Sequence, residues 1–372
     1  MNIPQMPVII YFFGCFLTAF LLGWIITPRI LLISYRKRLF DIPNERKVHA
    51  QPVPRLGGLS FLPSILIAFC LIMAIHDLIS TAESGFTVDD TEFLLLAVGC
   101  MILFLTGVGD DLIGLSYISK ICIQLVSALL LVLSGNWLHS LGGLFGITSL
   151  SAWTGILMTV FIIIYIINAI NLIDGIDGLA SGLSCISLSA LCILLVGIGH
   201  YAYALLGIAT LGVLIPFWFY NVFGTVQRGH KLFMGDVGSL TLGFILAFLV
   251  IHIGNCANFE GQGKSLVLAF STLLVPLFDV VRVVIHRLRE HRNPFLPDNN
   301  HFHHKLLRTG LHVRQVMAVI LLVSVFFLLM NYCLCSVTGI TTILFIDSIL
   351  WILIHLMIDY AMAIRKKKEH VT

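Results

Sequence analysis

Long apolar segments recur along the whole chain, and they restrict it to folds that are built within a lipid bilayer. A helix needs about 20 apolar residues to cross the hydrocarbon core. Hydrophobic residues make up 58% of the 372 residues and charged residues only 11%, whereas soluble domains carry about 25% charged residues. We therefore predict an all-α, polytopic membrane protein with a single transmembrane domain over residues 1–372. The predicted transmembrane helices, eleven in all, are 7–29, 56–76, 93–110, 118–136, 153–172, 178–198, 201–221, 239–255, 265–286, 314–336 and 341–364.

The distribution of basic residues predicts which ends of these helices face the cytoplasm. All 22 Lys and Arg residues except Lys264 lie in or beside the segments that follow the first, third, seventh, ninth and eleventh predicted helices. By contrast, the segment 77–92 contains five acidic residues and no base. Because cytoplasmic segments carry an excess of Lys and Arg, we expect an external N-terminus and a cytoplasmic C-terminus.

Aspartates that stand beside glycines occur where three predicted helices meet the cytoplasm. A single Asp-Gly pair at a helix end is commonly a cap, but three such motifs on one face favour a shared binding site. Clustered carboxylates repel one another unless a cation joins them, and oxygen ligands suit Mg²⁺. We therefore predict a Mg²⁺ site, with Mn²⁺ as the alternative cation. The aspartates are Asp110, Asp111, Asp174, Asp177 and Asp236.

Two asparagines precede one of these motifs. Asn168 and Asn171 stand one turn apart at the end of the fifth predicted helix, and Asp174 and Asp177 continue the spacing of three residues. An isolated Asn in a membrane helix commonly forms a hydrogen bond between helices. Here the amide oxygens would lie beside the acids, so we interpret the two asparagines as part of the same site.

A polar loop over 287–314 contains three histidines in a His-x-His-His pattern, namely His301, His303 and His304. The pattern is a candidate for zinc, but no cysteine or acid at the usual ligand spacing completes it. Imidazoles among basic residues better fit a lid that binds phosphate or sugar hydroxyls. A basic surface loop near anionic lipid is the simpler alternative.

The segment 41–58 is rich in proline and basic residues, and it includes His49 and Arg55. Alone, it predicts a structured cytoplasmic loop. Beside a metal bound by acids, it would add cationic groups for a diphosphate. The sequence contains no Walker phosphate loop and no nucleic-acid-binding module, so we expect no nucleic-acid partner.

Taken in their order along the chain, from about Asp41 to Arg308, these motifs resemble those of the polyprenyl-phosphate N-acetylhexosamine-1-phosphate transferases. The resemblance is to the bacterial branch that transfers GlcNAc-1-phosphate to undecaprenyl phosphate. It implies a Mg-dependent enzyme of the bacterial inner membrane with cytoplasmic active-site loops, acting in the first membrane step of cell-envelope polysaccharide synthesis. The implied partners are undecaprenyl phosphate, a UDP-N-acetylhexosamine and membrane lipid, and a homodimer is compatible with it.

The resemblance also implies a catalytic group around the lipid phosphate. Asp110 and Asp111 are similar to the family's Asp-rich motif near that phosphate, and Lys120 matches its downstream, phosphate-contacting lysine. Asn171 and Asp236 match the residues that hold Mg²⁺ with the substrate diphosphate. Asp110, Asp111 and Asp236 are therefore the expected catalytic residues.

For the nucleotide sugar, the resemblance implies a second set of contacts. Asp174 and Asp177 match positions near the nucleoside, with Asn168 beside them, and Phe233 matches the aromatic residue that stacks on uracil. The histidines of 301–304 match the loop that closes over the sugar. Their interruption by Phe302 favours the N-acetylhexosamine branch over the sister enzymes that transfer phospho-MurNAc-pentapeptide.

The sequence departs from the family pattern at two places. Asn299 follows Asp298 where a base is usual, and Asn221 lies fifteen residues before Asp236, farther than in the family. Both departures concern the preference for sugar and nucleotide.

The implied reaction joins two anions, because a lipid phosphate oxygen attacks the sugar-side phosphorus of the nucleotide sugar and UMP leaves. Asp110 or Asp111 would orient or deprotonate the lipid phosphate, and both a direct and a covalent aspartyl mechanism stay open. Another UDP-amino sugar or UDP-MurNAc-pentapeptide is the alternative donor. A secondary transporter is the alternative class, but its polar site would lie near the membrane midplane, whereas these acids lie at one end of their helices.

Overall fold

The computed structural model describes residues 7–41, 52–79, 85–256, 262–293 and 300–369, and these are almost entirely helical. Two two-residue strands pair in antiparallel fashion, Phe40 with Pro54 and Asp41 with Val53. The elements are α1 (Val8–Lys37), β1 (Phe40–Asp41), β2 (Val53–Pro54), the 3₁₀ helix η1 (Leu56–Ser60), α2 (Phe61–Ile79), α3 (Asp90–Ile113), α4 (Tyr117–Leu133), α5 (Ala152–Ile173), α6 (Leu179–Gly197), α7 (Tyr201–Phe223), α8 (Gly235–Asn255), α9 (Gln262–Ser271), α10 (Leu274–Arg289), α11 (Phe302–Arg308), α12 (Val313–Leu334) and α13 (Ile340–Glu369).

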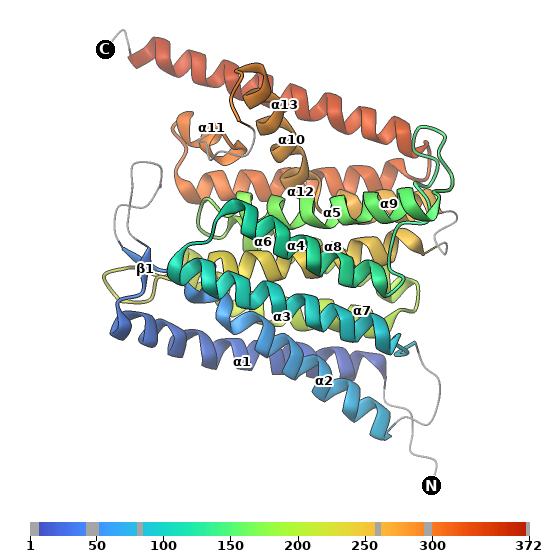
Figure 1. Cartoon of the computed structure of the whole chain (residues 1–372). Helices are drawn as coiled ribbons and strands as arrows, with labels where there is room; N and C mark the ends of the chain where they lie inside the picture. Colours follow the sequence, from blue (N-terminus) through green and yellow to red (C-terminus); the bar gives the residue numbers. More distant parts are fainter. Residues whose placement is uncertain (1–6, 42–51, 80–84, 257–261, 294–299, 370–372) are drawn as a thin grey trace.

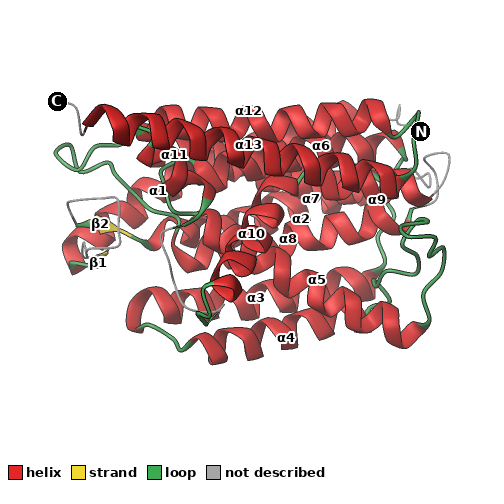
Figure 2. Cartoon of the chain, turned by 90° about the horizontal axis from the view of Figure 1, so that it is seen from above, coloured by secondary structure: helices red, strands yellow, loops and turns green. Residues whose placement is uncertain are grey.

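The helices confirm an all-α, multi-pass membrane protein. Nine helices in the described part of the chain are long and apolar enough to cross a membrane. The other two predicted spans, 118–136 and 265–286, fall on α4, which has 17 residues, and on α9 and α10. The count of eleven therefore stays a prediction. The start of α1 and the end of α13 lie at opposite ends of the bundle (Figures 1 and 2), as an odd number of crossings requires.

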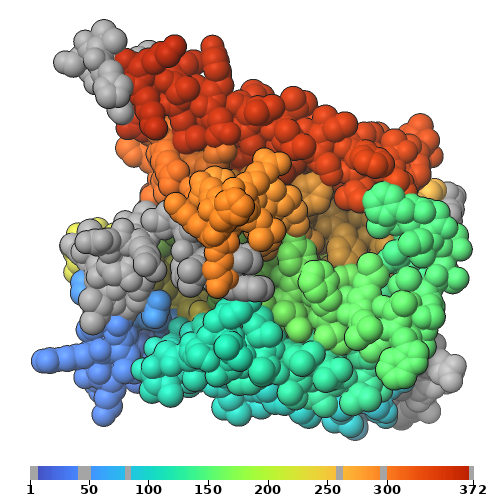
Figure 3. Space-filling model, turned by 45° about the horizontal axis from the view of Figure 1, so that its top comes forward, coloured from blue at the N-terminus to red at the C-terminus, as the bar shows by residue number. Residues whose placement is uncertain are grey.

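A bend of 76° separates α9 from α10. Pro276 lies in the first turn of α10, where its ring and its missing N–H prevent the helix from continuing through Thr272. The predicted span 265–286 is therefore divided into two helices by this bend, and its crossing of the membrane stays a prediction. Because of the bend, α10 turns out of the plane of its neighbours, and Figure 3 shows its orange side chains between the red α13 and the green α5.

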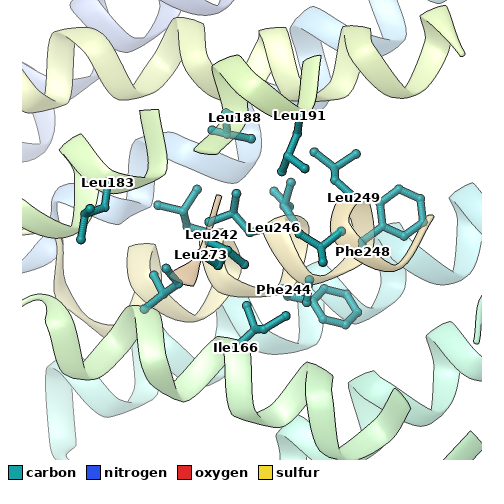
Figure 4. Packing of buried hydrophobic residues seen from close by; sticks show 14 of the residues in the cluster. Ile166, Leu183, Leu188, Leu191, Leu242, Phe244, Leu246, Phe248, Leu249 and Leu273 are labelled. Carbon is teal, nitrogen blue, oxygen red and sulfur yellow. The ribbon is translucent and has the colours of Figure 1, made fainter. Parts of the chain in front are cut away.

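α8 forms the centre of the bundle. Every residue from Val237 to Ile251 is buried, and a helix that is apolar on all sides is expected inside a large protein. Phe244 and Phe248 of α8 lie among leucines of α6 and α8 and Ile166 of α5 (Figure 4). Glycines permit the closest approaches, since a Cβ at Gly243 would lie 2.8 Å from the Ile167 Cα. The two ends of α8 are therefore held at fixed places.

Polar residues gather where α3 and α5 end and α8 begins. We call this the carboxylate end of the bundle and the opposite end, where α8 finishes, the far end. The β1–β2 pair lies at the carboxylate end (Figure 1).

Candidate active site

Asp110 and Asp111 lie in the last turn of α3, which ends at Gly114 in a positive-φ conformation. The Asp111 carboxylate accepts hydrogen bonds from the backbone N–H groups of Asp236 and Val237, at 3.1 and 3.2 Å. Asp111 thus satisfies free N–H groups at the start of α8. Its negative charge also interacts favourably with the positive end of the α8 helix dipole. The capping interpretation therefore holds for Asp111, although the helix that it caps is a different one.

Lys120 brings the remaining acids together. Its Nζ lies 2.7 Å from Asp110 Oδ2 and 2.6 Å from Asp236 Oδ2. Asp110 is held on its other oxygen by the backbone N–H of Leu115, at 2.7 Å. Asp110, Asp111 and Asp236 each offer a carboxylate oxygen within 4.8 Å of the others. These three carboxylates and Lys120 form one group, which we call the carboxylate cluster.

Asn171 completes this cluster, whereas Asn168 lies apart from it. The Asn171 amide donates to Asp236 Oδ1 at 3.1 Å and to Ser239 Oγ at 2.9 Å. Asn168 instead donates to Gln124 Oε1 of α4 at 2.6 Å. This bond is the interhelical contact typical of a membrane Asn, so the predicted contact of Asn168 with substrate stays a prediction.

The turn after α5 carries Asp174 and Asp177. Burial, together with the nearby charge of Asp236, raises the pKa of Asp174 to about 7. Asp177 pairs with Lys231, whose Nζ lies 2.6 Å from Asp177 Oδ2. Asp174 thus lies close enough to the carboxylate cluster for Asp236 to act on it, whereas Asp177 pairs with a lysine outside the cluster.

Asn221 anchors that turn. Its side-chain oxygen accepts from the Gly178 N–H at 2.5 Å, and its amide donates to the Leu232 carbonyl at 2.7 Å. Lys231 Nζ donates to the Asn221 carbonyl at 2.6 Å. Although Asn221 lies farther from Asp236 in the sequence than in the family, it thus joins the turn after α5 to the segment before α8.

The histidine segment packs directly onto the same turn. His303 is 1% exposed, and a Cβ on Gly175 would lie only 2.2 Å from its Nε2. Neither ring nitrogen of His303 has a hydrogen-bond partner in the described part of the chain. Burial, with the neighbouring His304 and His301, lowers the pKa of His303 to about 3. His303 is therefore a neutral imidazole above the Asp174–Gly178 turn, and His304 adjoins it with ring centroids 4.2 Å apart.

Asp279 of α10 was missed by the sequence analysis. Its carboxylate lies 2.8 Å from His301 Nδ1, accepts from the Phe302 N–H at 2.9 Å and lies 3.0 Å from Arg282. It therefore fixes the start of α11. A lone acid within a predicted apolar span costs about 2.5–3.5 kcal/mol on insertion, and that cost was the signal that could have identified it.

Phe302 has an anchoring role that its sequence position did not reveal. The side chain is fully buried, and its ring centroid lies 5.1 Å from those of both Trp351 and His355 of α13. Phe302 thus attaches α11 to α13, while His301 contacts α10 and His303 packs on the turn after α5.

Phe233 bonds to the backbone on both sides of Arg55. The Phe233 N–H donates to the Pro54 carbonyl at 2.8 Å, and the Gly57 N–H donates to the Phe233 carbonyl at 2.9 Å. Arg55 lies between these two bonds, close enough to Asp111 for its charge to act on that carboxylate. His49, Asp298 and Asn299 lie outside the described residues.

Comparison with known proteins finds a family match and several relatives. Residues 93–254 match the model of glycosyl transferase family 4. A protein of Haemophilus influenzae is 34% identical over 316 residues, which cover 84% of this chain and 82% of the relative. A protein of Yersinia pestis is 29% identical, over 78% of this chain and 76% of its own length. A protein of Escherichia coli O157:H7 is 32% identical, over 78% of this chain and 75% of its own length. All three relatives are named undecaprenyl-phosphate alpha-N-acetylglucosaminyl 1-phosphate transferase.

The match of the family model covers α3, α4, α5 and α8, which supply every member of the carboxylate cluster. With the similarity to the Haemophilus influenzae protein extending over most of both chains, the protein belongs to glycosyl transferase family 4.

Proposed function

We propose that this protein transfers GlcNAc-1-phosphate from UDP-GlcNAc to undecaprenyl phosphate and releases UMP. The names of the relatives support this reaction. The observation that carries it is the bridge from Lys120 to Asp110 and Asp236 at one end of a membrane bundle. A site of this kind can bring a lipid-borne phosphate and a water-soluble nucleotide sugar to one place.

We further propose that the carboxylate cluster holds Mg²⁺ during the reaction. The candidate ligand atoms are carboxylate and amide oxygens, which Mg²⁺ prefers, whereas zinc favours imidazole nitrogen and thiolate sulfur. Asp236 and Asn171 are the candidate ligands, as the family resemblance implies; they lie beside each other, with the Asn171 amide 3.1 Å from Asp236 Oδ1. A bound Mg²⁺ would neutralise the charge of the substrate diphosphate.

The task of the protein side chains is to bring two anions together. A phosphate monoester loses its second proton with a pKa of about 6, so the acceptor is already nucleophilic at neutral pH without a strong protein base. Lys120 binds the acceptor phosphate through its ammonium group, which releases a carboxylate when the phosphate arrives. Asp110 orients that ammonium group. The attacking phosphate oxygen forms the new P–O bond while the bond to UMP breaks.

The nucleotide sugar would lie between the turn after α5 and the segment before α8. Phe233 offers an aromatic ring to the base, and His303 and His304 of α11 lie on the sugar side. Since His303 is neutral, its imidazole N–H can donate to an N-acetyl or hydroxyl oxygen without attracting a second proton.

An apolar cavity of about 230 Å³ supports a membrane acceptor. It lies among α5, α9, α10 and α13, and Met158, Leu274, Leu277, Phe278 and Ile343 are among its lining residues. We propose that it takes isoprene units of the lipid tail.

We propose that the carboxylate end faces the cytoplasm, where nucleotide sugars are made. Arg36 and Lys37 end α1, Lys305 and Arg308 lie on α11, and Arg365 lies near the end of α13. Basic residues are concentrated on the cytoplasmic side of membrane proteins. Cysteines introduced at Arg308 should react with an impermeant reagent only in inverted vesicles, and cysteines at Asp77 only in intact cells; the reverse pattern would refute this orientation.

Purified full-length protein, undecaprenyl phosphate and a panel of UDP-sugars test the function. We expect UMP and undecaprenyl-diphosphate-GlcNAc with UDP-GlcNAc, and much slower transfer from UDP-MurNAc-pentapeptide. Asp236→Asn serves as the inactive reference and Asp77→Asn, at a side chain 72% exposed at the far end, as its matched control. Faster transfer from the peptide-bearing donor would overturn the choice of sugar, and no transfer from any UDP-sugar would overturn the reaction.

A further inference from the structure

Two histidines and a cysteine meet at the far end of the bundle. His200 precedes α7, His252 lies in the last turn of α8, and Cys256 follows α8. His200 Nδ1 lies 2.8 Å from His252 Nε2 and 3.9 Å from Cys256 Sγ. One donor atom from each residue lies within 4.8 Å of the other two. The proposed transfer reaction uses none of them, because the carboxylate cluster lies at the other end of α8.

These separations are close to those of a zinc site. Tetrahedral zinc binds imidazole nitrogen at about 2.0–2.1 Å and thiolate sulfur at about 2.3 Å, so two ligand nitrogens lie about 3.4 Å apart and nitrogen and sulfur about 3.6 Å apart. The observed 2.8 and 3.9 Å differ from these values by about 0.6 and 0.3 Å. Small side-chain rotations would remove both differences, since His252 and Cys256 belong to consecutive turns at a helix end.

A carboxylate stands behind one of the histidines. Glu92 Oε1 of α3 lies 3.6 Å from His252 Nδ1, and the Tyr203 hydroxyl donates to Glu92 Oε2 at 2.5 Å. The Tyr203 ring also stacks on His252 with a centroid distance of 3.7 Å. Metal-binding histidines usually donate their second ring N–H to a carboxylate, and at 3.6 Å Glu92 lies slightly beyond the length of such a bond. The arrangement orients the His252 ring and leaves Nε2 to face His200 and Cys256.

We propose that His200, His252 and Cys256 bind one Zn²⁺ ion, with water in the fourth position. Imidazole and thiolate ligands favour zinc over the hard cations that suit the carboxylate cluster. On binding, the His200–His252 hydrogen bond is replaced by two zinc–nitrogen bonds, and the Cys256 thiol releases its proton to solvent as the zinc–sulfur bond forms. The ion would join the start of α7 to the end of α8 and, through Glu92, to α3.

The experiment measures zinc bound to full-length protein in detergent, after removal of any affinity tag and of metal with a chelator. Wild type should rebind about one zinc per chain, as an assembled site requires. His252→Ala and Cys256→Ser should abolish this binding, and Glu92→Gln should weaken it by about 10- to 100-fold. Cys122→Ser and His286→Ala replace the same residue types elsewhere, and they should bind zinc as the wild type does.

Cobalt gives a second readout that follows the ligands themselves. Co²⁺ in the wild-type site should show thiolate-to-metal charge transfer and the intense visible bands of tetrahedral coordination, and Cys256→Ser should lose the charge-transfer band. Transfer activity of each variant shows that it is folded, since none of these residues belongs to the carboxylate cluster. Wild-type protein that binds no zinc, or active Cys256→Ser protein that binds it equally, would show that the residues form only a hydrogen-bonded chain.

Discussion

Replacing Lys120 with methionine should have two opposite effects, slower transfer and tighter binding of Mg²⁺. The ammonium group lies 2.7 Å from Asp110 Oδ2 and 2.6 Å from Asp236 Oδ2, where it competes with a metal ion for the same oxygens. Methionine keeps most of the apolar stem and removes the charge. The variant therefore loses a phosphate-binding group while its carboxylates become more attractive to a cation.

The magnitudes follow from the geometry. Two unit charges about 4 Å apart interact by about 4 kcal/mol at an effective dielectric constant of about 20. The Lys120 and Asp236 side chains are 23% and 21% exposed, so screening reduces the change to about 1–2 kcal/mol, nearer the value of exposed pairs. That change corresponds to Mg²⁺ binding about 5- to 30-fold more tightly. Loss of a charged hydrogen bond to phosphate costs about 1.5–3 kcal/mol, which lowers kcat/KM by about 10- to 150-fold.

Two measurements separate the effects. Transfer rates over a range of Mg²⁺ concentrations give the half-saturating concentration, and electron paramagnetic resonance of Mn²⁺ gives affinity without turnover. Lys231→Met is the matched control, because Lys231 pairs with Asp177 at 2.6 Å and does not contact the carboxylate cluster in the described structure; its Mn²⁺ affinity should equal that of the wild type. Weaker metal binding by Lys120→Met, or unchanged kcat/KM, would refute the shared role of these oxygens.

Three further changes probe the same end of the bundle. Asp236→Asn should lower kcat by at least about a hundredfold, since it removes several kcal/mol of charge stabilisation, while the melting temperature in detergent stays near that of wild type; near-normal rates at saturating Mg²⁺ would refute its role as a ligand. Gly175→Ala should lower kcat/KM by about 5- to 150-fold, because the added methyl displaces His303 at a strain of about 1–3 kcal/mol; Gly339→Ala provides a control, since a Cβ there has no atom within 4 Å and the backbone is not in a positive-φ conformation. Burial lowers the pKa of His303 to about 3, so below about pH 6.5 the unfolded chain binds a proton that the folded protein does not, and the free energy of unfolding should fall as the pH decreases. The melting temperature should fall less steeply with decreasing pH in His303→Gln than in the wild type. Equal slopes of melting temperature against pH would contradict a buried, neutral imidazole.

Hydropathy predicted the helices well because each span must satisfy its backbone internally and present apolar side chains to lipid. The ends of these spans were also informative. Acids beside glycines at the ends of α3 and α5 and at the start of α8 predicted that distant segments share a site, and the structure brings Asp110, Asp111 and Asp236 together. A charged residue in an apolar segment can occupy only a few positions without a large cost in free energy. Its presence therefore strongly constrains how that segment packs.

Pairings within the site were not predictable in this way. Asp110 and Asp236 are joined by a lysine that is 116 residues from Asp236, and no local pattern encodes that partner. The role of Asp279 depends on the bend at Pro276, which directs α10 out of the bundle toward His301. Hydropathy counts apolar residues and is insensitive to such a bend. The same holds for the far end, where His200 and His252 are separated by 52 residues.

The contrast between α8 and α11 indicates which part of the site moves when substrates bind. α8 is buried on all sides, and its first turn is capped by Asp111, so Asp236 cannot shift without disturbing the core. α11 has only seven residues. It is held through Phe302, the contacts of His301 and Phe302 with Asp279, the ion pair of Lys305 with Asp359 and the bond from Arg365 to the Arg308 carbonyl. A helix of that length is not stable by itself, so its position depends on those few contacts. Closure over a nucleotide sugar should therefore come from α11 approaching a fixed carboxylate cluster, with the Asp174–Gly178 turn as the surface on which it rests.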